Sequence, residues 1–402
     1  KSRGTILAQL ERLGASCDWD REAFTMDGGF HDAVIKTFCD FYDKGLIYRG
    51  KRLVNWDPHF QSAISDLEVE NIEVQGHMCF FFNDTATTEI YTYVERDEDG
   101  HVIREEERDY ISIATTRPET MLGDGAVAVH PDDPRYAPIV GKLCEIPVGP
   151  KKARRLIPII TDDYPDPEFG SGAVKITGAH DFNDYAVAQR NGIPLYILLS
   201  PDAHMREDGL SYAESAEIAR AVANGEMTAD QVDVDAVNLV PDAYRGLDRF
   251  EARKRIVADI SAEGLAVMMP DEAGHPQPFV EQKPIVQPFG DRSKVVIEPM
   301  LTDQWFVDAR TLAQPAIAAV RDGRTTFAPE NWSKTYFQWL ENIEPWCISR
   351  QLWWGHQIPV WYDAEGNPYC ALSEAEAVEM AGGKALTRDP DVLDTWFSSA
   401  LW

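Results

Sequence analysis

Apolar side chains recur at helical spacing in the opening part of the chain. Positions 6, 7, 10 and 13 place isoleucine and leucine on one helix face, and Gly14 follows as a C-terminal stop. The same spacing returns over residues 30–42, with Gly45 as the next stop. The apolar run at residues 53–56 predicts a short strand that leads into a loop. The beginning of the chain is therefore expected to be largely helical.

The middle of the chain changes to short apolar runs separated by glycine, proline and aspartate, which is the pattern of β-strands. One helix is also predicted at about residues 248–263, because Asp248 and Glu251 form a variant of the capping box and Gly264 ends the segment. The middle is therefore expected to be rich in strands. The runs that predict them are residues 110–114, 126–130, 172–177 and 194–199.

The tryptophans are unevenly distributed along the sequence. Trp19 and Trp56 come early, none follows until Trp305, and nine of the 11 lie from that position onward. A tryptophan-free stretch between tryptophan-containing flanks suggests one domain inserted into another, with boundaries in polar and proline-rich sequence. We therefore expect residues 1–73 and 286–402 to form one domain in two parts, and residues 74–285 to form an inserted, strand-rich domain.

The composition describes an ordinary globular protein of 402 residues with a hydrophobic fraction of 44%. The formal net charge of −29 argues mildly against a nucleic-acid partner, because phosphate binding favours lysine and arginine. No apolar run approaches the roughly 20 residues that a membrane helix needs. The chain also opens without the pattern of a signal segment, so a cytoplasmic location and no membrane partner are expected.

The 6 cysteines are dispersed along the chain. No two of them are closer than 22 residues, so the paired spacing of a zinc knuckle is absent. Dispersed cysteines of this kind usually serve as small buried apolar side chains. A metal site is therefore not expected.

Residues 83–92 read NDTATTEIYT and differ in character from their surroundings. One reading frame of a widely used sequencing-library adapter translates to this string, so residues 79–91 are hypothesised to derive from an adapter. The alternative is an ordinary threonine-rich surface hairpin. Neither interpretation assigns a function to these threonines.

The motif ATTRPET follows the strand predicted at residues 110–114 and carries the first candidate chemistry. Its proline suits the first position of a helix. Hydroxyls and a guanidinium beside a helix N-terminus suit an anionic or ester-bearing ligand. The alternative is a capped helix with a surface ion pair between the arginine and the glutamate. The candidate residues of this motif are Thr115, Thr116, Arg117 and Glu119.

The motif FGSGAVKITGAHDFND carries the second candidate chemistry. Lys175 and Thr177 are two residues apart on a predicted strand, so their side chains leave the same face. His180, Asp181 and Asp184 follow in a polar loop. A cation, a hydroxyl and two carboxylates together could hold an aminoacyl group. The alternatives are a metal-dependent HD phosphohydrolase, which would need further ligands, and a plain capped strand end.

Six motifs in this order make the chain resemble bacterial-type valyl-tRNA synthetases over nearly its whole length: GASCDW, KRLVNW, ATTRPETMLGD, GAVKITGAHDFNDY, WCISRQLWWGHQIPVW and DVLDTWFSSALW. The resemblance implies an α/β fold, in which a class I Rossmann-type catalytic domain is interrupted by a β-rich α+β editing domain. It also implies that valine is activated with ATP and magnesium and joined to tRNA(Val), and that threonine mischarged onto this tRNA is hydrolysed. An isoleucyl or leucyl enzyme, or a tRNA-binding module without catalysis, remains an alternative.

The resemblance further implies roles for individual editing residues. Asp184 would bind the ammonium of the substrate, and Asp181 would bind the threonine hydroxyl or orient the attacking water. Lys175 and Arg117 would hold the ester and the terminal adenosine. The residues that match the editing pocket are Phe169, Lys175, Thr177, Asp181 and Asp184, with Arg117 from the other motif.

The resemblance also extends to the synthetic half of the family. Asp18 matches the position that binds the valine ammonium, and Trp354 and Trp396 match walls of the valine pocket, with Trp353 as the alternative to Trp354. Relatives with zinc carry cysteine pairs that this chain lacks, so no zinc is expected. The ATP motifs HIGH and KMSKS are expected upstream and downstream of these residues, so at most editing is expected from this fragment. The expected partners are tRNA(Val), valine and threonine, and the expected state is a monomer.

Overall fold

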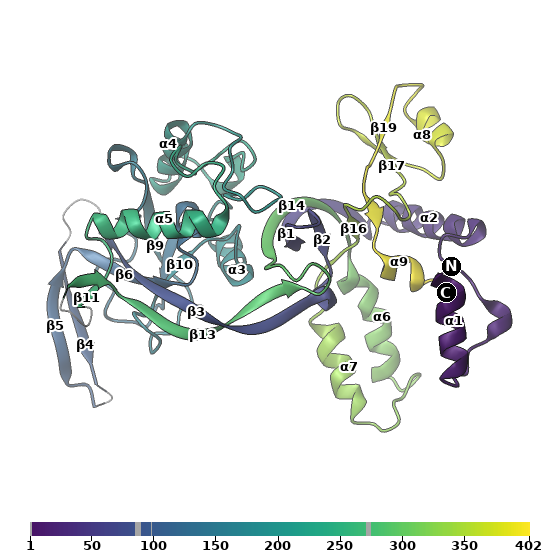
Figure 1. The fold of residues 1–402 in the computed structure, drawn as a ribbon, viewed down its shortest axis with the longest axis horizontal. Coiled ribbons are helices and arrows are strands. Elements are labelled where there is room, and N and C mark those ends of the chain that lie inside the picture. Colours follow the sequence, from purple (N-terminus) through teal and green to yellow (C-terminus); the bar gives the residue numbers. More distant parts are fainter. Residues whose placement is uncertain (1, 85–89, 98, 271–274) are drawn as a thin grey trace. The chain divides into compact units, whose positions relative to one another are not determined.

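The computed structural model describes residues 2–84, 90–97, 99–270 and 275–402 (Figure 1). The chain divides into two compact units, one made of Lys1–Arg49 with Trp305–Trp402 and the other of Gly50–Gln304. The first unit is thus assembled from two separated parts of the sequence. Residues 85–89 of the threonine-rich segment lie outside the described residues, so the hypothesis about its origin stays untested there.

A seven-stranded sheet organises the unit Gly50–Gln304. Strands β7 and β9 pair in parallel, and the other pairings for which a register is defined are antiparallel. Three of the four strands predicted in the middle of the chain are therefore confirmed. The sheet runs β10 (Ala173–Ile176), β7 (Ala126–Val129), β9 (Leu156–Thr161), β8 (Leu143–Glu145), β3 (Val69–Asp84) and β13 (Val280–Gly290), with β6 (Tyr110–Thr115) also paired to β3.

The strand predicted at residues 194–199 is wrong. These residues form neither a strand nor a helix, and of them only Leu199 makes a ladder-type bridge, to Met205. The apolar side chains still enter the core, where Tyr196 and Leu198 are buried. The backbone N–H of Leu198 donates to the ring of His180 instead of to a strand. Continuous burial therefore arises here without a sheet partner.

Strands β3 and β13 form the longest pairing in the chain, visible in Figure 1 as a long two-stranded ribbon. Their register runs from Val69 opposite Gly290 to Cys79 opposite Val280. The domain boundaries predicted at 73/74 and 285/286 fall on neighbouring pairs of this ribbon, because Glu73 faces Val286 and Val74 faces Ile285. The compact units divide elsewhere, at 49/50 and 304/305, and the boundaries themselves stay a prediction.

Three helices accompany the sheet: α3 (Phe182–Asn191), α4 (Tyr212–Ala223) and α5 (Arg249–Ala262). The helix predicted at about residues 248–263 is confirmed as α5, and the carboxylate of Asp248 caps it by accepting the N–H groups of Phe250 and Glu251. Its buried side chains include Ile256 and Ile260, which join the main core of this unit.

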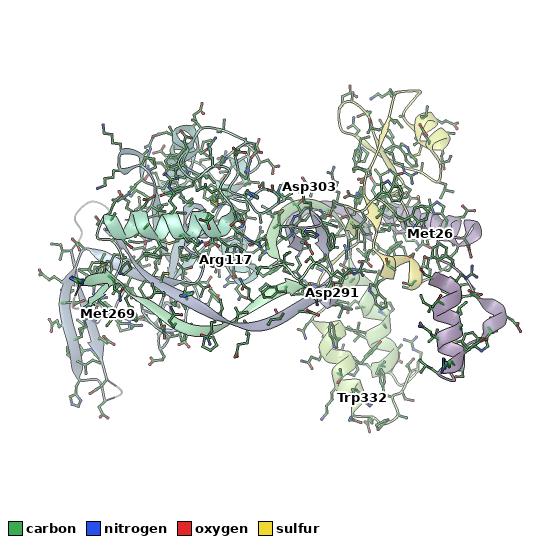
Figure 2. The ribbon with its side chains drawn as sticks, in the orientation of Figure 1. Met26, Arg117, Met269, Asp291, Asp303 and Trp332 are labelled. Carbon is green, nitrogen blue, oxygen red and sulfur yellow. The ribbon has the colours of Figure 1, made fainter. Side chains whose placement is uncertain are left out.

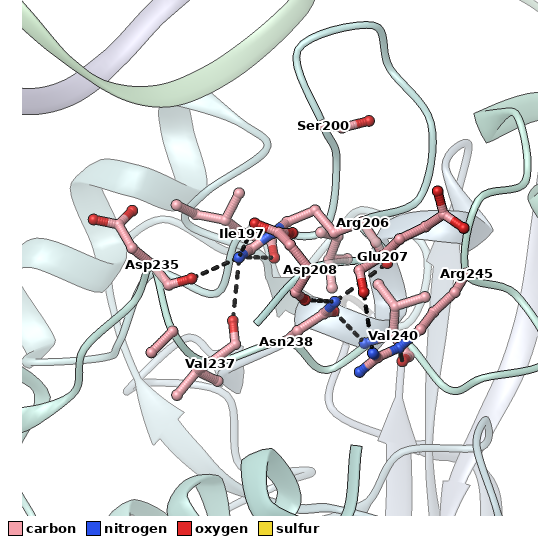
Figure 3. A network of polar contacts seen from close by, with 12 residues as sticks. Ile197, Ser200, Arg206, Glu207, Asp208, Asp235, Val237, Asn238, Val240 and Arg245 are labelled. Atoms are coloured by element: carbon pink, nitrogen blue, oxygen red, sulfur yellow. Dashed lines mark hydrogen bonds and ion pairs between the residues drawn. The ribbon is translucent and has the colours of Figure 1, made fainter. Parts of the chain in front are cut away.

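The segment between α3 and α5 has little regular structure and is fixed by a network of polar contacts centred on Arg206 (Figure 3). The buried guanidinium of Arg206 donates to the carbonyl oxygens of Ile197, Val237 and Asp235, at 3.3, 3.2 and 2.5 Å. It also pairs with Asp208 at 2.8 Å. Since buried carbonyl groups need donors, this one side chain replaces several backbone ladder bonds.

The other unit has its own core, which combines helix α2 (Gly28–Asp43) with later strands. Val34 and Phe38 of α2 pack in one cluster with Trp305 and Ile348. The two helices predicted near the start are confirmed as α1 (Ser2–Arg12) and α2. The remaining helices of this unit are α6 (Ala309–Arg321), α7 (Trp332–Glu341), α8 (Glu374–Met380) and α9 (Thr395–Ser399).

Short strands complete the chain. The strand predicted at residues 53–56 lies within β1, and none of the described helices is long and apolar enough to cross a membrane. Beyond the seven-stranded sheet, the strands are β1 (Ile47–Asp57), β2 (Ser62–Ile64), β4 (Tyr91–Arg96), β5 (Val102–Arg108), β11 (Met268–Pro270), β12 (Pro276–Pro278), β14 (Glu298–Val307), β15 (Trp346–Cys347), β16 (Ser349–Arg350), β17 (Val360–Tyr362), β18 (Pro368–Cys370), β19 (Thr387–Arg388) and β20 (Val392–Leu393).

Candidate active site

The ATTRPET motif joins strand β6 to a short 3-10 helix that begins at Pro118, as the sequence predicted. Thr115 is buried, and its hydroxyl accepts the backbone N–H of Arg117 at 3.0 Å. Thr116 is half-buried. The guanidinium of Arg117, which Figure 2 labels, donates to the carbonyl oxygen of His180 at 3.0 Å. This hydrogen bond connects the two candidate motifs.

Arg117 belongs to a chain of alternating charges. It donates to Glu119 at 3.2 Å and to Glu298 at 2.5 Å. Arg253 holds both oxygens of Glu119, at 2.7 and 2.8 Å, and Arg249 pairs with Glu298. Glu119 is only 1% exposed, so the alternative of a surface ion pair is wrong. Burial works against ionisation of Glu119, but Arg253 and Arg117 outweigh it and lower its pKa.

Lys175 and Thr177 lie side by side on and just after β10, as the two-residue spacing predicted. The ammonium of Lys175 donates to the hydroxyls of Thr177 and Thr120 at 2.5 and 3.2 Å. The hydroxyl of Thr177 donates to Asp124 at 2.5 Å, and Lys175 lies 3.6 Å from the same carboxylate. Asp124 is fully buried, and this burial raises its pKa against the opposing charge of Lys175.

The two aspartates of the second motif have different environments. Asp181 is exposed and caps α3, because its carboxylate accepts the N–H groups of Asn183 and Asp184 at 2.8 and 3.1 Å. Asp184 is 5% exposed and accepts the backbone N–H of Thr177 at 2.8 Å. Burial raises the pKa of Asp184 to about 6. Asp184 is thus a carboxylate whose charge changes just below neutral pH.

His180 is a buried, neutral side chain. Its Nε2 accepts the N–H of Leu198 at 3.0 Å, so its proton resides on Nδ1. Burial, together with the charges of Arg117 and Lys175, lowers the pKa of His180 to about 3. Its ring therefore supports the loop and holds no exchangeable charge near neutral pH.

Phe169 is a predicted editing residue that no polar contact among the described residues joins to this cluster. Its ring is 67% exposed and lies 5.4 Å from the ammonium of Lys283. The turn that follows it uses Gly172 with φ +74°, where a Cβ atom would collide with the guanidinium of Arg135. The turn thus directs the chain into β10, whose end carries the cluster.

The cluster also contains residues that sequence reasoning missed. Asp124 ends the quoted string ATTRPETMLGD, and a carboxylate in an otherwise apolar run was the available signal. Arg253 lies outside both motifs, and it reaches back to Glu119 from α5. Glu298 gave no sequence signal, because its partner Arg117 is 181 residues away in the chain.

The residues proposed for valine binding belong to the other unit. Asp18 is exposed and pairs with Arg21 at 2.7 Å. Trp354 and Trp396 are 63% and 60% exposed, and Trp353 is 96% exposed with its ring 6.3 Å from that of Trp354. None of the described contacts joins Asp18 to these rings, so their grouping stays a prediction.

Metal ligands gather in only one place within the described ranges, where Asp97, Asp99 and His101 lie exposed between β4 and β5. Exposed acidic groups of this kind are common without an ion, and nothing else there indicates one. The HD phosphohydrolase alternative receives no support, because the ring of His180 is engaged with Leu198.

Comparison with known proteins places this chain in a family. The model of the family described as tRNA synthetases class I (I, L, M and V) matches residues 1–402. The chain therefore belongs to this class I tRNA synthetase family, as its six motifs predicted. Among its relatives, the similarity is to valine–tRNA ligases: that of Ruegeria pomeroyi is 60% identical over 99% of this chain and 46% of its own length.

Two further relatives bear the same name. The valine–tRNA ligases of Zymomonas mobilis and Rhizorhabdus wittichii are 53% and 52% identical over 100% of this chain, and over 39% and 38% of their own lengths. The chain thus spans less than half the length of these relatives. A solved LeuRS complex from Agrobacterium radiobacter K84 is 15% identical over 98% of this chain and 46% of that one, with a TM-score of 0.29, which is too low to support an argument.

Proposed function

We propose that this chain is part of a valine–tRNA ligase, and that its strand-rich unit removes threonine from mischarged tRNA(Val). The similarity to valine–tRNA ligases supports the first part. The observation that carries the second is the contiguous polar cluster of Lys175, Thr177, Asp124 and Asp184. A polar cluster of this kind suits a substrate that differs from valine by one hydroxyl.

Discrimination between valine and threonine explains the need for such a site. The two side chains have nearly the same shape, and an apolar pocket rejects the added hydroxyl poorly, by only about a hundredfold in the known case of valyl-tRNA synthetases. A second site can bind the hydroxyl of threonine and leave its own polar groups unpaired with valine. The cluster has hydroxyl, ammonium and carboxylate groups available for this purpose.

The groups suggest a division of roles in hydrolysis. Ionised Asp184 would bind the ammonium of the threonyl group, and Asp181 would bind its hydroxyl or orient a water molecule. Lys175 would stabilise the charge that develops on the ester carbonyl oxygen, and Arg117 and Phe169 would contact the terminal adenosine. Water adds to the carbonyl carbon, the ester C–O bond breaks, and the ribose oxygen leaves with a proton.

Further properties of the whole enzyme belong to the same proposal. ATP with magnesium would supply the adenylate that activates valine, with Asp18, Trp354 and Trp396 around the amino acid. Neither zinc nor a membrane partner forms part of the proposal. We expect a cytoplasmic monomer that binds tRNA(Val), valine and threonine, with residues 74–285 as the editing domain.

A deacylation assay tests the editing proposal. The chain should release threonine from threonyl-tRNA(Val) and leave valyl-tRNA(Val) intact, whereas Lys175→Ala and Asp184→Asn should lose about a hundredfold or more of this activity. Asp163→Asn serves as the matched control, because Asp163 is exposed. Inactivity of the parent chain, with tRNA binding retained, would instead favour the tRNA-binding module. Full activity in both variants would remove the assignment.

A further inference from the structure

A cavity of about 560 Å³ lies in the unit Gly50–Gln304, next to the backbone of Asp124. It contains none of the residues assigned to editing. Strand β9 and helix α4 supply apolar lining, including Ile157, Ala219 and Val222. Exposed residues such as Gly192 and Thr228 form its rim. A volume of this size is typical of small-molecule sites.

The cavity holds one buried cation, Arg155. This residue is 2% exposed, and its guanidinium donates to the carbonyl oxygens of Asp124 and Leu122, the first at 3.0 Å. Its Nε is buried and has no hydrogen-bond partner. No carboxylate of the described residues forms an ion pair with it, and burial lowers the pKa of Arg155. A buried guanidinium that forms no ion pair is costly, because the two backbone carbonyl groups and the charge of Asp124, which lies beyond ion-pair distance, compensate only part of its charge.

The lining also restricts the charge of a ligand. Among the described residues that line the cavity, Arg155 is the single cationic side chain, and the exposed Asp230 lies at the rim. A dianion such as a phosphate would therefore lack a second cation and would face a carboxylate. A monoanion with an apolar body matches both the isolated guanidinium and the apolar lining. The ring of Tyr196, centred 5.5 Å from the guanidinium carbon, adds an aromatic surface beside the charge.

We propose that this cavity binds a small organic monocarboxylate, with its carboxylate on Arg155 and its apolar body between β9 and α4. The ligand would complete the hydrogen bonding of the guanidinium and neutralise its charge. Arg155 touches the polar cluster through the backbone of Asp124, but the proposed ligand contacts neither tRNA nor the side chains of Lys175 and Asp184, so its binding is measured separately from editing.

Calorimetric titration of the full 402-residue chain with 4-phenylbutanoate tests the proposal, with 4-phenylbutanol as the neutral control. Saturable one-to-one binding of the acid is expected, and the alcohol should bind about tenfold or more weakly, because it lacks the charge-assisted contact. Val222→Phe should lower the affinity for the acid by about tenfold or more, because the phenyl ring of the new side chain occupies the cavity. Val286→Phe is the matched control, since Val286 is 66% exposed on β13.

Three results would overturn the proposal: no saturable binding of the acid at about 10 mM, equal affinity for acid and alcohol, or unchanged affinity in Val222→Phe. Circular dichroism establishes that the variant is folded. If Val222→Phe does not fold, Ala219→Leu, which also narrows the cavity, takes its place with the same expected loss. Arg155 itself is left intact because its bonds to two carbonyl groups support the fold.

Discussion

Replacement of Asp184 by asparagine should make the strand-rich unit more stable at neutral pH while it abolishes the proposed editing. The carboxylate is 5% exposed, and burial raises its pKa from 3.8 to about 6. The folded chain therefore holds a proton more tightly than the unfolded chain. Such a group stabilises the fold at low pH, and this stabilisation is lost as the pH rises from about 4 through 6. An asparagine oxygen can still accept the N–H of Thr177.

The size of the effect follows from the two pKa values. A difference of about two corresponds to about 3 kcal/mol of unfolding free energy, at 1.36 kcal/mol for each pKa unit. The unfolding free energy of Asp184→Asn should exceed that of the parent chain by up to about 3 kcal/mol at pH 8, where the native carboxylate is ionised. At pH 5 the gain should fall to about half, because the folded carboxylate is then mostly protonated while the unfolded one is mostly ionised.

Urea unfolding followed by circular dichroism at pH 5 and pH 8 measures the difference, and threonyl-tRNA(Val) hydrolysis measures the activity. The same titration should appear in the parent enzyme as a loss of deacylation below about pH 6, since a protonated Asp184 no longer attracts the substrate ammonium. A variant that is less stable than the parent at pH 8, or that differs from it equally at both pH values, would refute this reasoning.

Three other substitutions probe separate features. Asp162→Asn should cost about 1 kcal/mol of unfolding free energy at pH 7 and about half of that near pH 3 in urea unfolding, because the exposed Arg190 lowers the pKa of Asp162 to about 2 and that stability is lost as the pH falls from about 4 through 2. Arg206→Met should lower the free energy of unfolding by about 3 kcal/mol or more, because three buried carbonyl groups lose their hydrogen-bond donor. Limited proteolysis should then cut the segment between α3 and α5. In thermal unfolding, Gly172→Ala should lower the midpoint more than Gly170→Ala, because both have positive φ but only the first collides with neighbours.

Local sequence rules predicted the elements that local forces determine. Helix α5 was predictable because its first-turn carboxylate and its terminal glycine act within a few residues. The structure of residues 194–199 was not predictable, because an apolar run has the same sequence whether its backbone pairs with a strand or donates to a histidine ring. The deciding contact, from Leu198 to His180, depends on how a distant loop folds.

The candidate site likewise contains contacts that depend on nearby residues and contacts that depend on distant ones. The pairing of Lys175 with Thr177 follows from the two-residue repeat of a strand and was predictable. The burial of Glu119 was not, because it requires Arg253 from α5 and the pair of Arg117 with Glu298. A solvent-exposed pair and a buried network can therefore share one local sequence, since the partners that distinguish them are far apart in the chain.

The β3–β13 ribbon has a consequence for the connectivity of the protein. Because Val74 and Ile285 face each other, the two points at which the chain enters and leaves residues 74–285 are about one strand spacing apart, roughly 5 Å. A two-residue Asn-Gly turn could close the flanking chain across that distance. The intervening 74–285 segment could likewise be expressed alone, or joined end to end and reopened at another loop. The proposed insertion at a paired ribbon would thus change the geometry of its host very little.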